Sequence, residues 1–365
     1  MNNDKDNIMS CKNNKNKLTI SVVMANYNYG KYIGEAIDAI VKQSFRPTEF
    51  IIIDDGSTDN SVSIIKKFQI EYPWIKLIQN KKNIGGHNAI NIALNEATGD
   101  YIYSAASDDK ILPGFIEKSM NLLSENTKAG LSCSDYIVNV GKINYKKKLN
   151  LSNKPQYYSP EESVRLFMKH DFTPIIANST IIKRSALLEA GGYMPKHKWS
   201  CDTFAHHVVT FRYGFCYIPE VLTFVRAHAA QYGASSAKNS KLERELIRTL
   251  MDSIQTSPYR DVLMKFERTA PFSVSPWDVL MVVISNKKYH KFMSFKLLRF
   301  AILEPIIKQL SNIVLISPVI FIIYRIQNMR WRFIISLFII VIMLILLCCD
   351  LFVSWRDEQK RKERK

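Results

Sequence analysis

The sequence lacks the features that mark several common protein classes. Its six cysteines form no Cys-x-x-Cys pair and no zinc-finger spacing, so we expect no disulfide framework and a reduced, cytosolic setting for the soluble part. Residues 1–17 contain no apolar stretch, which argues against a signal peptide, and their Asn- and Lys-rich composition predicts a disordered leader. Neither Gly-x-Gly-x-x-Gly, nor a Walker pattern, nor His-Glu-x-x-His occurs.

Positive charge, by contrast, is abundant. The formal net charge is +17, which suits a nucleic acid, an anionic membrane face or a phosphorylated substrate. The cluster Lys146–Lys148 has no interleaved aromatic side chains of the kind that bind single strands. We therefore expect no nucleic-acid partner.

Strand and helix patterns alternate from Leu18 onward. The predicted strands are Leu18–Met24, Phe50–Ile53, Trp74–Ile78 and Tyr101–Tyr103, with helical periodicity between them. This order predicts an α/β fold with a mostly parallel sheet flanked by helices. In such sheets, ligands bind beyond the carboxyl ends of the strands, and polar clusters occur there in this sequence.

The chain divides by composition. We expect a catalytic domain over residues 18–235, a helical extension over 236–305, a membrane-associated region over 306–355 and a basic tail over 356–365. Phe333–Val353 holds a single charge, Asp350, and is long enough to cross a bilayer.

A second apolar segment, Leu310–Tyr324, is shorter and contains Pro318. Both segments together would form a hairpin with the domain and the basic tail on the cytoplasmic side; a single crossing stays open. The expected location is the cytoplasmic membrane, with the catalytic domain on its cytoplasmic face.

Two pairs of carboxylates end predicted strands. Asp54 and Asp55 follow the second strand, and Asp108 and Asp109 follow the fourth. Asp oxygens are the ligands that Mg²⁺ and Mn²⁺ prefer, usually one or two of them together with substrate phosphates. Each pair alone also fits a turn or a helix cap. The ordered series on successive strand–helix units favours a nucleotide site.

The same series resembles a known family. The matching segments, in chain order, are Val22–Asn28, Glu49–Ser57, Asn83–Gly85, Gly99–Ile102, Ser107–Asp109, Gly191–Tyr193 and Cys201–Asp202. Together they are similar to the motifs of family 2 inverting glycosyltransferases with the GT-A fold, over roughly residues 18–235. The resemblance implies a front half that binds a nucleotide-sugar, a back half that binds the acceptor, and a divalent metal.

The resemblance also implies roles for individual residues. Asp108 would bind Mg²⁺ or Mn²⁺, and Asp202 would be the catalytic base. The donor nucleotide-sugar would contact Ala25, Tyr27, Asp54, Asp55, Asn83, Ser107, Asp109 and Arg226. The acceptor would lie against Gly191, Gly192 and Trp199.

Three positions depart from the family pattern. Ala25 replaces a usual Pro, Ala106 replaces the first Asp of Asp-x-Asp, and Cys201 replaces the Glu before the base. The expected function is transfer of a sugar, with inversion, from a UDP- or similar donor to a glycan or lipid-linked glycan. The change at Ala106 keeps open an inactive scaffold subunit as the alternative, while a sugar-nucleotidyltransferase lacks its Gly-rich signature.

Histidines offer a weaker signal. His206 and His207 fall on a predicted helix, and His228 follows the last strand of the domain. Because no metal-binding spacing accompanies them, we interpret all three as helix-surface or acceptor-pocket residues.

Overall fold

The computed structural model describes residues 18–169, 175–228, 239–269 and 275–306. Two compact units divide the chain, residues 1–294 and 295–365. The first unit therefore contains most of the segment predicted as a helical extension. The predicted leader, both predicted membrane segments (310–324 and 333–353) and the basic tail lie outside the described residues. Within the described part, no helix has the length and apolar character needed to cross a membrane.

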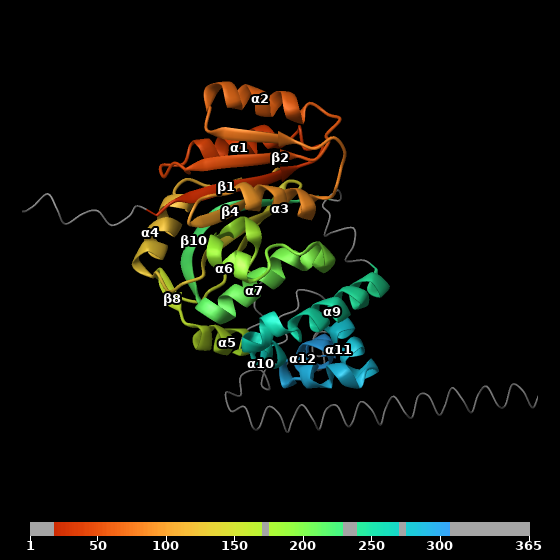
Figure 1. Cartoon of the computed structure of the whole chain (residues 1–365). Coiled ribbons are helices and arrows are strands. Elements are labelled where there is room, and N and C mark those ends of the chain that lie inside the picture. The colour runs from red at the N-terminus through yellow and green to blue at the C-terminus, as the bar shows by residue number, and fades with distance from the viewer. Residues whose placement is uncertain (1–17, 170–174, 229–238, 270–274, 307–365) are drawn as a thin grey trace, which may run out of the picture. The chain divides into compact units, whose positions relative to one another are not determined.

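The front of the first unit is a parallel sheet, as predicted. Its strands are β1 (Ile20–Asn26), β2 (Glu49–Asp54), β3 (Ile75–Gln79) and β4 (Tyr101–Ala106), in the spatial order β3-β2-β1-β4. The connecting helices are α1 (Ile33–Val41), α2 (Ser61–Glu71) and α3 (Gly86–Glu96). These strands lie side by side in Figure 1 with helices against them. The prediction of a mostly parallel α/β sheet is confirmed.

Burial explains why these segments form the centre of the sheet. All four residues of Phe50–Ile53 are buried, as are Val22 and Val23 of β1. A strand that is apolar on both faces needs cover on both sides. One face packs on α1, α2 and α4 (Phe115–Glu125) in a single apolar core, and α3 packs against β1 and β2.

The sheet continues with strands that sequence patterns did not resolve. β9 (Thr180–Lys183) lies antiparallel between β4 and β6 (Leu131–Val140), and β10 (Phe215–Ala227) runs parallel to β6. Short antiparallel strands are added by β5 (Lys110–Ile111) and β8 (Gln156–Tyr158) on β10 and by β7 (Ile143–Lys147) on β6. The carboxyl ends of β1, β2, β4, β6 and β10 therefore share one edge of the sheet.

Helices complete the first unit. They are α5 (Pro160–Lys169), α6 (Arg184–Glu189), α7 (Cys201–Tyr213), α9 (Ser240–Ile254), α10 (Arg260–Thr269) and α11 (Pro276–Ser285), with 3₁₀ turns η1 (Ala177–Ser179), η2 (Pro195–Ser200), η3 (Ser257–Tyr259) and η4 (Lys287–Phe292). In the second unit, the described residues form α12 (Phe295–Leu298) and a π-helical turn, Arg299–Leu303.

Helix α9 packs against η2, and α10 packs against α5 and α7. Because η2 leads directly into α7, the helices after residue 239 support the start of α7.

Candidate active site

Hydrogen bonds join the loops after β1 and β2 at the edge of the sheet formed by the carboxyl ends of the parallel strands. Asp54 is buried; its Oδ1 accepts from Asn26 Nδ2 at 2.8 Å and its Oδ2 accepts from Ser57 N at 3.0 Å. Asn28 has a left-handed backbone with φ of 57° and accepts through Oδ1 from Thr58 N at 2.8 Å. The Asp54 carboxylate thus joins the ends of β1 and β2, which form the wall of the predicted base pocket.

Two further predicted donor residues line the same wall. Ala25 is half-buried in β1, opposite Ala106 of β4. Tyr27 is exposed beyond the end of β1. Their contacts to a nucleotide stay predictions.

The second carboxylate of that pair organises the next loop. Asp55 is buried and accepts from Asn80 Nδ2 at 2.8 Å, from Ile84 N at 3.0 Å and from Gly85 N at 2.9 Å. Asn83 Oδ1 also accepts from Gly85 N, at 2.8 Å. All these bonds hold the turn that precedes α3, so Asp55 positions the loop that carries Asn83.

The predicted metal ligand meets a histidine 120 positions further along the chain. Asp108 Oδ2 lies 2.9 Å from His228 Nε2, and both side chains are largely buried. The His228 ring stacks on Tyr32, with centroids 5.7 Å apart, and meets the edge of Tyr29 at 5.9 Å. His228 thus lies at the end of β10, not on a helix, and the helix-surface interpretation of it is wrong.

This pair is compatible with a metal that also binds substrate phosphates. One carboxylate oxygen and one imidazole nitrogen lie side by side, and divalent ions in such sites take few protein ligands. Among the described residues, no group of three His, Cys, Asp or Glu side chains could by itself hold a metal ion. The residues therefore fit a partly substrate-coordinated ion and do not fit a closed structural site.

Asp109 turns away from Asp108 and anchors the neighbouring strands. Its Oδ1 accepts from Arg226 N at 2.6 Å, and its other oxygen accepts from Asn178 Nδ2. Burial raises the pKa of Asp109, and the adjacent Asp108 charge raises it further. Ser107 is buried beside them.

The Arg226 side chain crosses this cluster. Its guanidinium donates to Glu35 Oε2 at 2.6 Å and to the carbonyl of Asp108, and it lies 5.1 Å from the Tyr32 ring centroid. Arg226 therefore ties β10 to α1 and to the Asp108 backbone. A phosphate contact, as predicted from the resemblance, would compete with these bonds.

Asp202 lies in the first turn of α7, and Ser200 is the N-cap residue. The half-buried carboxylate of Asp202 accepts from Thr203 N at 2.7 Å. Burial lowers the pKa values of His87 and His206, and the negative charge of Asp202 opposes both shifts. Asp202 thus lies among the side chains of α3 and α7.

Tyr193 links this region to the end of β4. Its hydroxyl lies 3.0 Å from Ser104 Oγ and 3.4 Å from His206 Nε2, and its backbone carbonyl accepts from Asn91 Nδ2 at 2.6 Å. His206 and His207 are buried in α7, which excludes the helix-surface alternative for them; the acceptor-pocket alternative stays a prediction.

The predicted acceptor residues lie in turns. Gly191 and Gly192 have φ of +90° and +64°, and their N–H groups donate to Leu188 and Leu187 carbonyls at 2.9 Å, which ends α6. A left-handed backbone of this kind favours glycine at helix ends. Trp199 is half-buried in η2. Their turn geometry is clear, and the acceptor contacts stay predictions.

Comparison with known proteins agrees with this arrangement. The family model described as glycosyl transferase family 2 matches residues 21–189. This segment, which is less than half of the chain, is similar to that family. Glycosyltransferase GlyG of Streptococcus pneumoniae is 38% identical over 98 residues, which are 27% of this chain and 33% of GlyG. The match thus spans only about a third of that relative.

Two solved structures are similar in fold to this chain. S. aureus TarS 1-349, in complex with UDP-GlcNAc, superposes with a TM-score of 0.52 at 17% identity, covering 69% of this chain and 72% of TarS 1-349. The mannosyltransferase PcManGT from Pyrobaculum calidifontis, in complex with GDP-Man and Mn²⁺, gives 0.51 at 17% identity, covering 82% and 81%. At these identities the likeness establishes the GT-A-type fold.

Sequence reasoning missed several hydrogen-bond partners in the candidate site. Asn178, which donates to Asp109, and Glu35, which accepts from Arg226, belong to no recognised motif. His228, which contacts Asp108, was assigned to another environment. The signal for His228 was its place two residues after Arg226, at the end of a strand that could reach the same edge.

Proposed function

We propose that the chain is a metal-dependent, inverting glycosyltransferase that moves a sugar from a nucleotide-sugar to an acceptor hydroxyl. The observation that carries the proposal is the convergence of Asp108 and His228 where β4 and β10 end, with Nε2 and Oδ2 2.9 Å apart. The similarity of residues 21–189 to glycosyl transferase family 2 supports the reaction class.

Asp108 and His228 would hold the metal. A bound divalent ion supplies Lewis-acid stabilisation of the diphosphate leaving group. An imidazole ligand favours Mn²⁺ over Mg²⁺, because Mg²⁺ takes oxygen ligands almost exclusively. Asp109 and Arg226 would keep the Asp108 segment in place through their own hydrogen bonds.

Asp202 would act as the base. It takes the proton from the acceptor hydroxyl while that oxygen forms a bond to the anomeric carbon. The bond from this carbon to the phosphate oxygen breaks on the opposite side, so the configuration inverts and the nucleoside diphosphate leaves with the electron pair. General-base catalysis of this kind contributes about 10²–10⁴-fold.

The acceptor we propose is a glycan or a lipid-linked glycan at the cytoplasmic face of the cytoplasmic membrane. Support comes from the sequence, in which Phe333–Val353 is long enough to span a bilayer and the net charge is +17. UDP and GDP are the donor nucleotides to test first, because the two neighbours that share the fold bind UDP-GlcNAc and GDP-Man.

The second candidate is a catalytically inactive scaffold with the same fold. The observation in its favour is Ala106, which places a methyl group where the family's first metal-motif Asp would stand. The two candidates differ in whether metal strengthens nucleotide binding.

Calorimetric titration of the detergent-solubilised full chain with UDP and then GDP, each with and without Mn²⁺, separates them. Metal-dependent binding that is lost in Asp108→Asn and weakened in His228→Gln would support the enzyme. Asp202→Asn is the matched control, because it should keep nucleotide binding and lose turnover. Failure of every nucleotide to bind in the presence of Mn²⁺ would favour the scaffold.

A further inference from the structure

A basic hairpin at the side of the sheet takes no part in the site described above. It consists of the end of β6, from Tyr136 to Val140, and of β7, joined by a two-residue turn of Gly141 and Lys142. Gly141 has φ of +63°, the conformation that such a turn requires at its first central position. In the part of the chain that is described, β7 pairs with β6 alone, so its other edge is open.

One face of this basic hairpin is apolar and exposed. Val140 pairs with Ile143, and Val138 pairs with Tyr145, so these four side chains point to the same side. Val140, Ile143 and Tyr145 are 49%, 56% and 50% exposed. Three large apolar side chains together at a hairpin tip mark an interaction surface.

Positive charge occurs on both faces of the hairpin, with Lys147 on the apolar face and Lys146 on the other. Lys142 lies in the turn, Lys146 and Lys147 lie on β7, and Lys148 follows directly; all four are exposed. No acidic residue occurs between Tyr136 and Asn150. Pairing of two such hairpins would bring like charges together, and lysines on an open strand are a common device against edge-to-edge association. An anionic surface is the complementary partner.

The tip of the basic hairpin lies at the same edge of the sheet as the site. In the parallel β6–β10 pair, Asn139 is opposite Arg226 and Val140 is opposite Ala227. Neighbouring strands lie about 4.8 Å apart. The tip of the hairpin is therefore adjacent to Arg226, which bonds to Asp108 and Asp109.

We infer that the basic hairpin docks on an anionic lipid surface, with Val140, Ile143 and Tyr145 entering the headgroup region and the lysines contacting lipid phosphates. Docking would hold the donor edge of the sheet beside the membrane. This assignment deepens the proposed function, because docking would bring a lipid-linked acceptor to the site. Only this consequence rests on the proposed function.

Hydrogen exchange of the full chain tests the inference without requiring activity. The full chain is reconstituted in vesicles of phosphatidylcholine alone or of phosphatidylcholine with phosphatidylglycerol, and exchange of the amides of residues 137–148 is followed by mass spectrometry. We expect slower exchange with phosphatidylglycerol, and the protection should weaken at high salt because ions screen the contact.

The matched variants are a triple substitution in the basic hairpin, Lys142→Ala with Lys146→Ala and Lys147→Ala, and a control of equal charge. The control replaces three other exposed lysines by alanine: Lys66, Lys67 and Lys128. Each juxtamembrane lysine contributes about 1 kcal/mol, so the hairpin triple variant should weaken docking about 100-fold. The control should keep the protection.

Equal exchange in both vesicle types, or equal loss in both triple variants, would overturn the inference. Protection in detergent alone that grows with protein concentration would overturn it in favour of a second copy of the chain. Nucleotide titration of the hairpin triple variant should match that of the unmodified chain. Absence of nucleotide binding in the unmodified chain would therefore defeat the proposed function and leave the hairpin result standing.

Discussion

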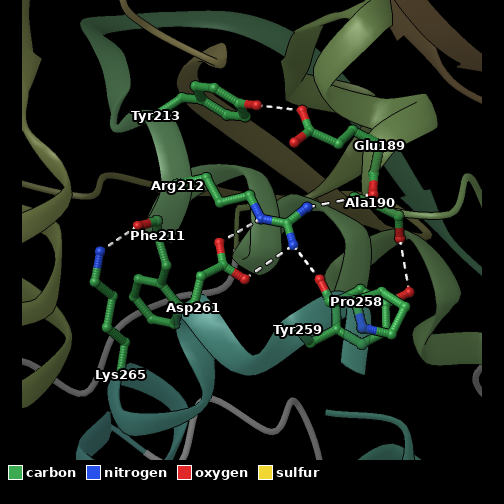
Figure 2. A network of polar contacts seen from close by, with 9 residues as sticks. All are labelled: Glu189, Ala190, Phe211, Arg212, Tyr213, Pro258, Tyr259, Asp261 and Lys265. Carbon is green, nitrogen blue, oxygen red and sulfur yellow. Dashed lines mark hydrogen bonds and ion pairs between the residues drawn. The ribbon is translucent and has the colours of Figure 1, made fainter. Parts of the chain in front are cut away.

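Arg212 offers a sharp test of how the helices after residue 239 support α7. Its guanidinium donates to both carboxylate oxygens of Asp261 in α10, at 2.8 and 3.0 Å. It also donates to the Glu189 carbonyl at 3.3 Å and to the Pro258 carbonyl (Figure 2). The Arg212 side chain is 10% exposed and that of Asp261 is 55% exposed. The perturbation is Arg212→Ala, compared with Asp261→Ala.

The contacts set the expected magnitudes. The ion pair is open to solvent on the Asp261 side, so it contributes about 0.5–1 kcal/mol to the free energy of unfolding. Each hydrogen bond to a carbonyl adds about 1 kcal/mol, and Arg212→Ala removes both of them as well as the pair. We therefore expect a loss of about 2–3 kcal/mol for Arg212→Ala and of about 0.5–1 kcal/mol for Asp261→Ala.

Thermal unfolding of the full chain in detergent measures the difference. The Arg212→Ala variant should melt roughly 4–10 °C below the unmodified chain. In the double variant, loss of Asp261 should cost little more, because its partner is already gone. Equal shifts for the two single variants would refute the reasoning, since they would mean that the carbonyl contacts of Arg212 contribute nothing.

Three further outcomes are expected. Burial lowers the pKa of His197, whose Nε2 lies 2.9 Å from Ser253 Oγ, to about 4 from 6.5. The unfolded chain therefore binds a proton at His197 more readily than the folded chain, so the free energy of unfolding is highest above pH 6.5 and falls as the pH is lowered toward 4. His197→Gln should remove this pH dependence, which amounts to about 2 kcal/mol at pH 5, in pH-resolved thermal melts. Asp202→Asn should lower kcat by about 10²-fold or more with little change in donor KM; an unchanged kcat would remove Asp202 as the base. Gly214→Ala should lower the free energy of unfolding by more than about 2 kcal/mol, because φ is +72° and the added Cβ would lie 2.1 Å from the Tyr158 carbonyl oxygen. Gly34→Ala is the control: its added Cβ would make ordinary contacts in α1, so the variant should be neutral or slightly stabilised in the same melts.

The first four strands could be predicted because the signal for each is local. Phe50–Ile53 is an uninterrupted apolar run, and a strand buried on both faces needs such a run. Once the strands are parallel, the residues that end them must share an edge. The prediction that Asp54 and Asp108 lie at one edge of the sheet therefore followed from chain order, and the β1–β2 and β1–β4 registers confirm it.

Side-chain direction at that edge could not be predicted in the same way. Asp54 and Asp55 are adjacent in sequence, yet one bonds to Asn26 and the other holds the Ile84–Gly85 turn. Successive side chains of a strand point to opposite faces, and the strand's end then decides which loop each one meets.

The sequence by itself determined the fold class, the order of the motifs and the edge at which chemistry would occur, because these depend on local periodicity and on connectivity. Only the tertiary structure decided that His228 meets Asp108 across 120 positions of sequence, that Asn178 meets Asp109 across 69, and that the tip of the basic hairpin lies beside Arg226. The physical reason is that these contacts depend on the register of β4, β6, β9 and β10, and that register is set by the packing of the whole sheet.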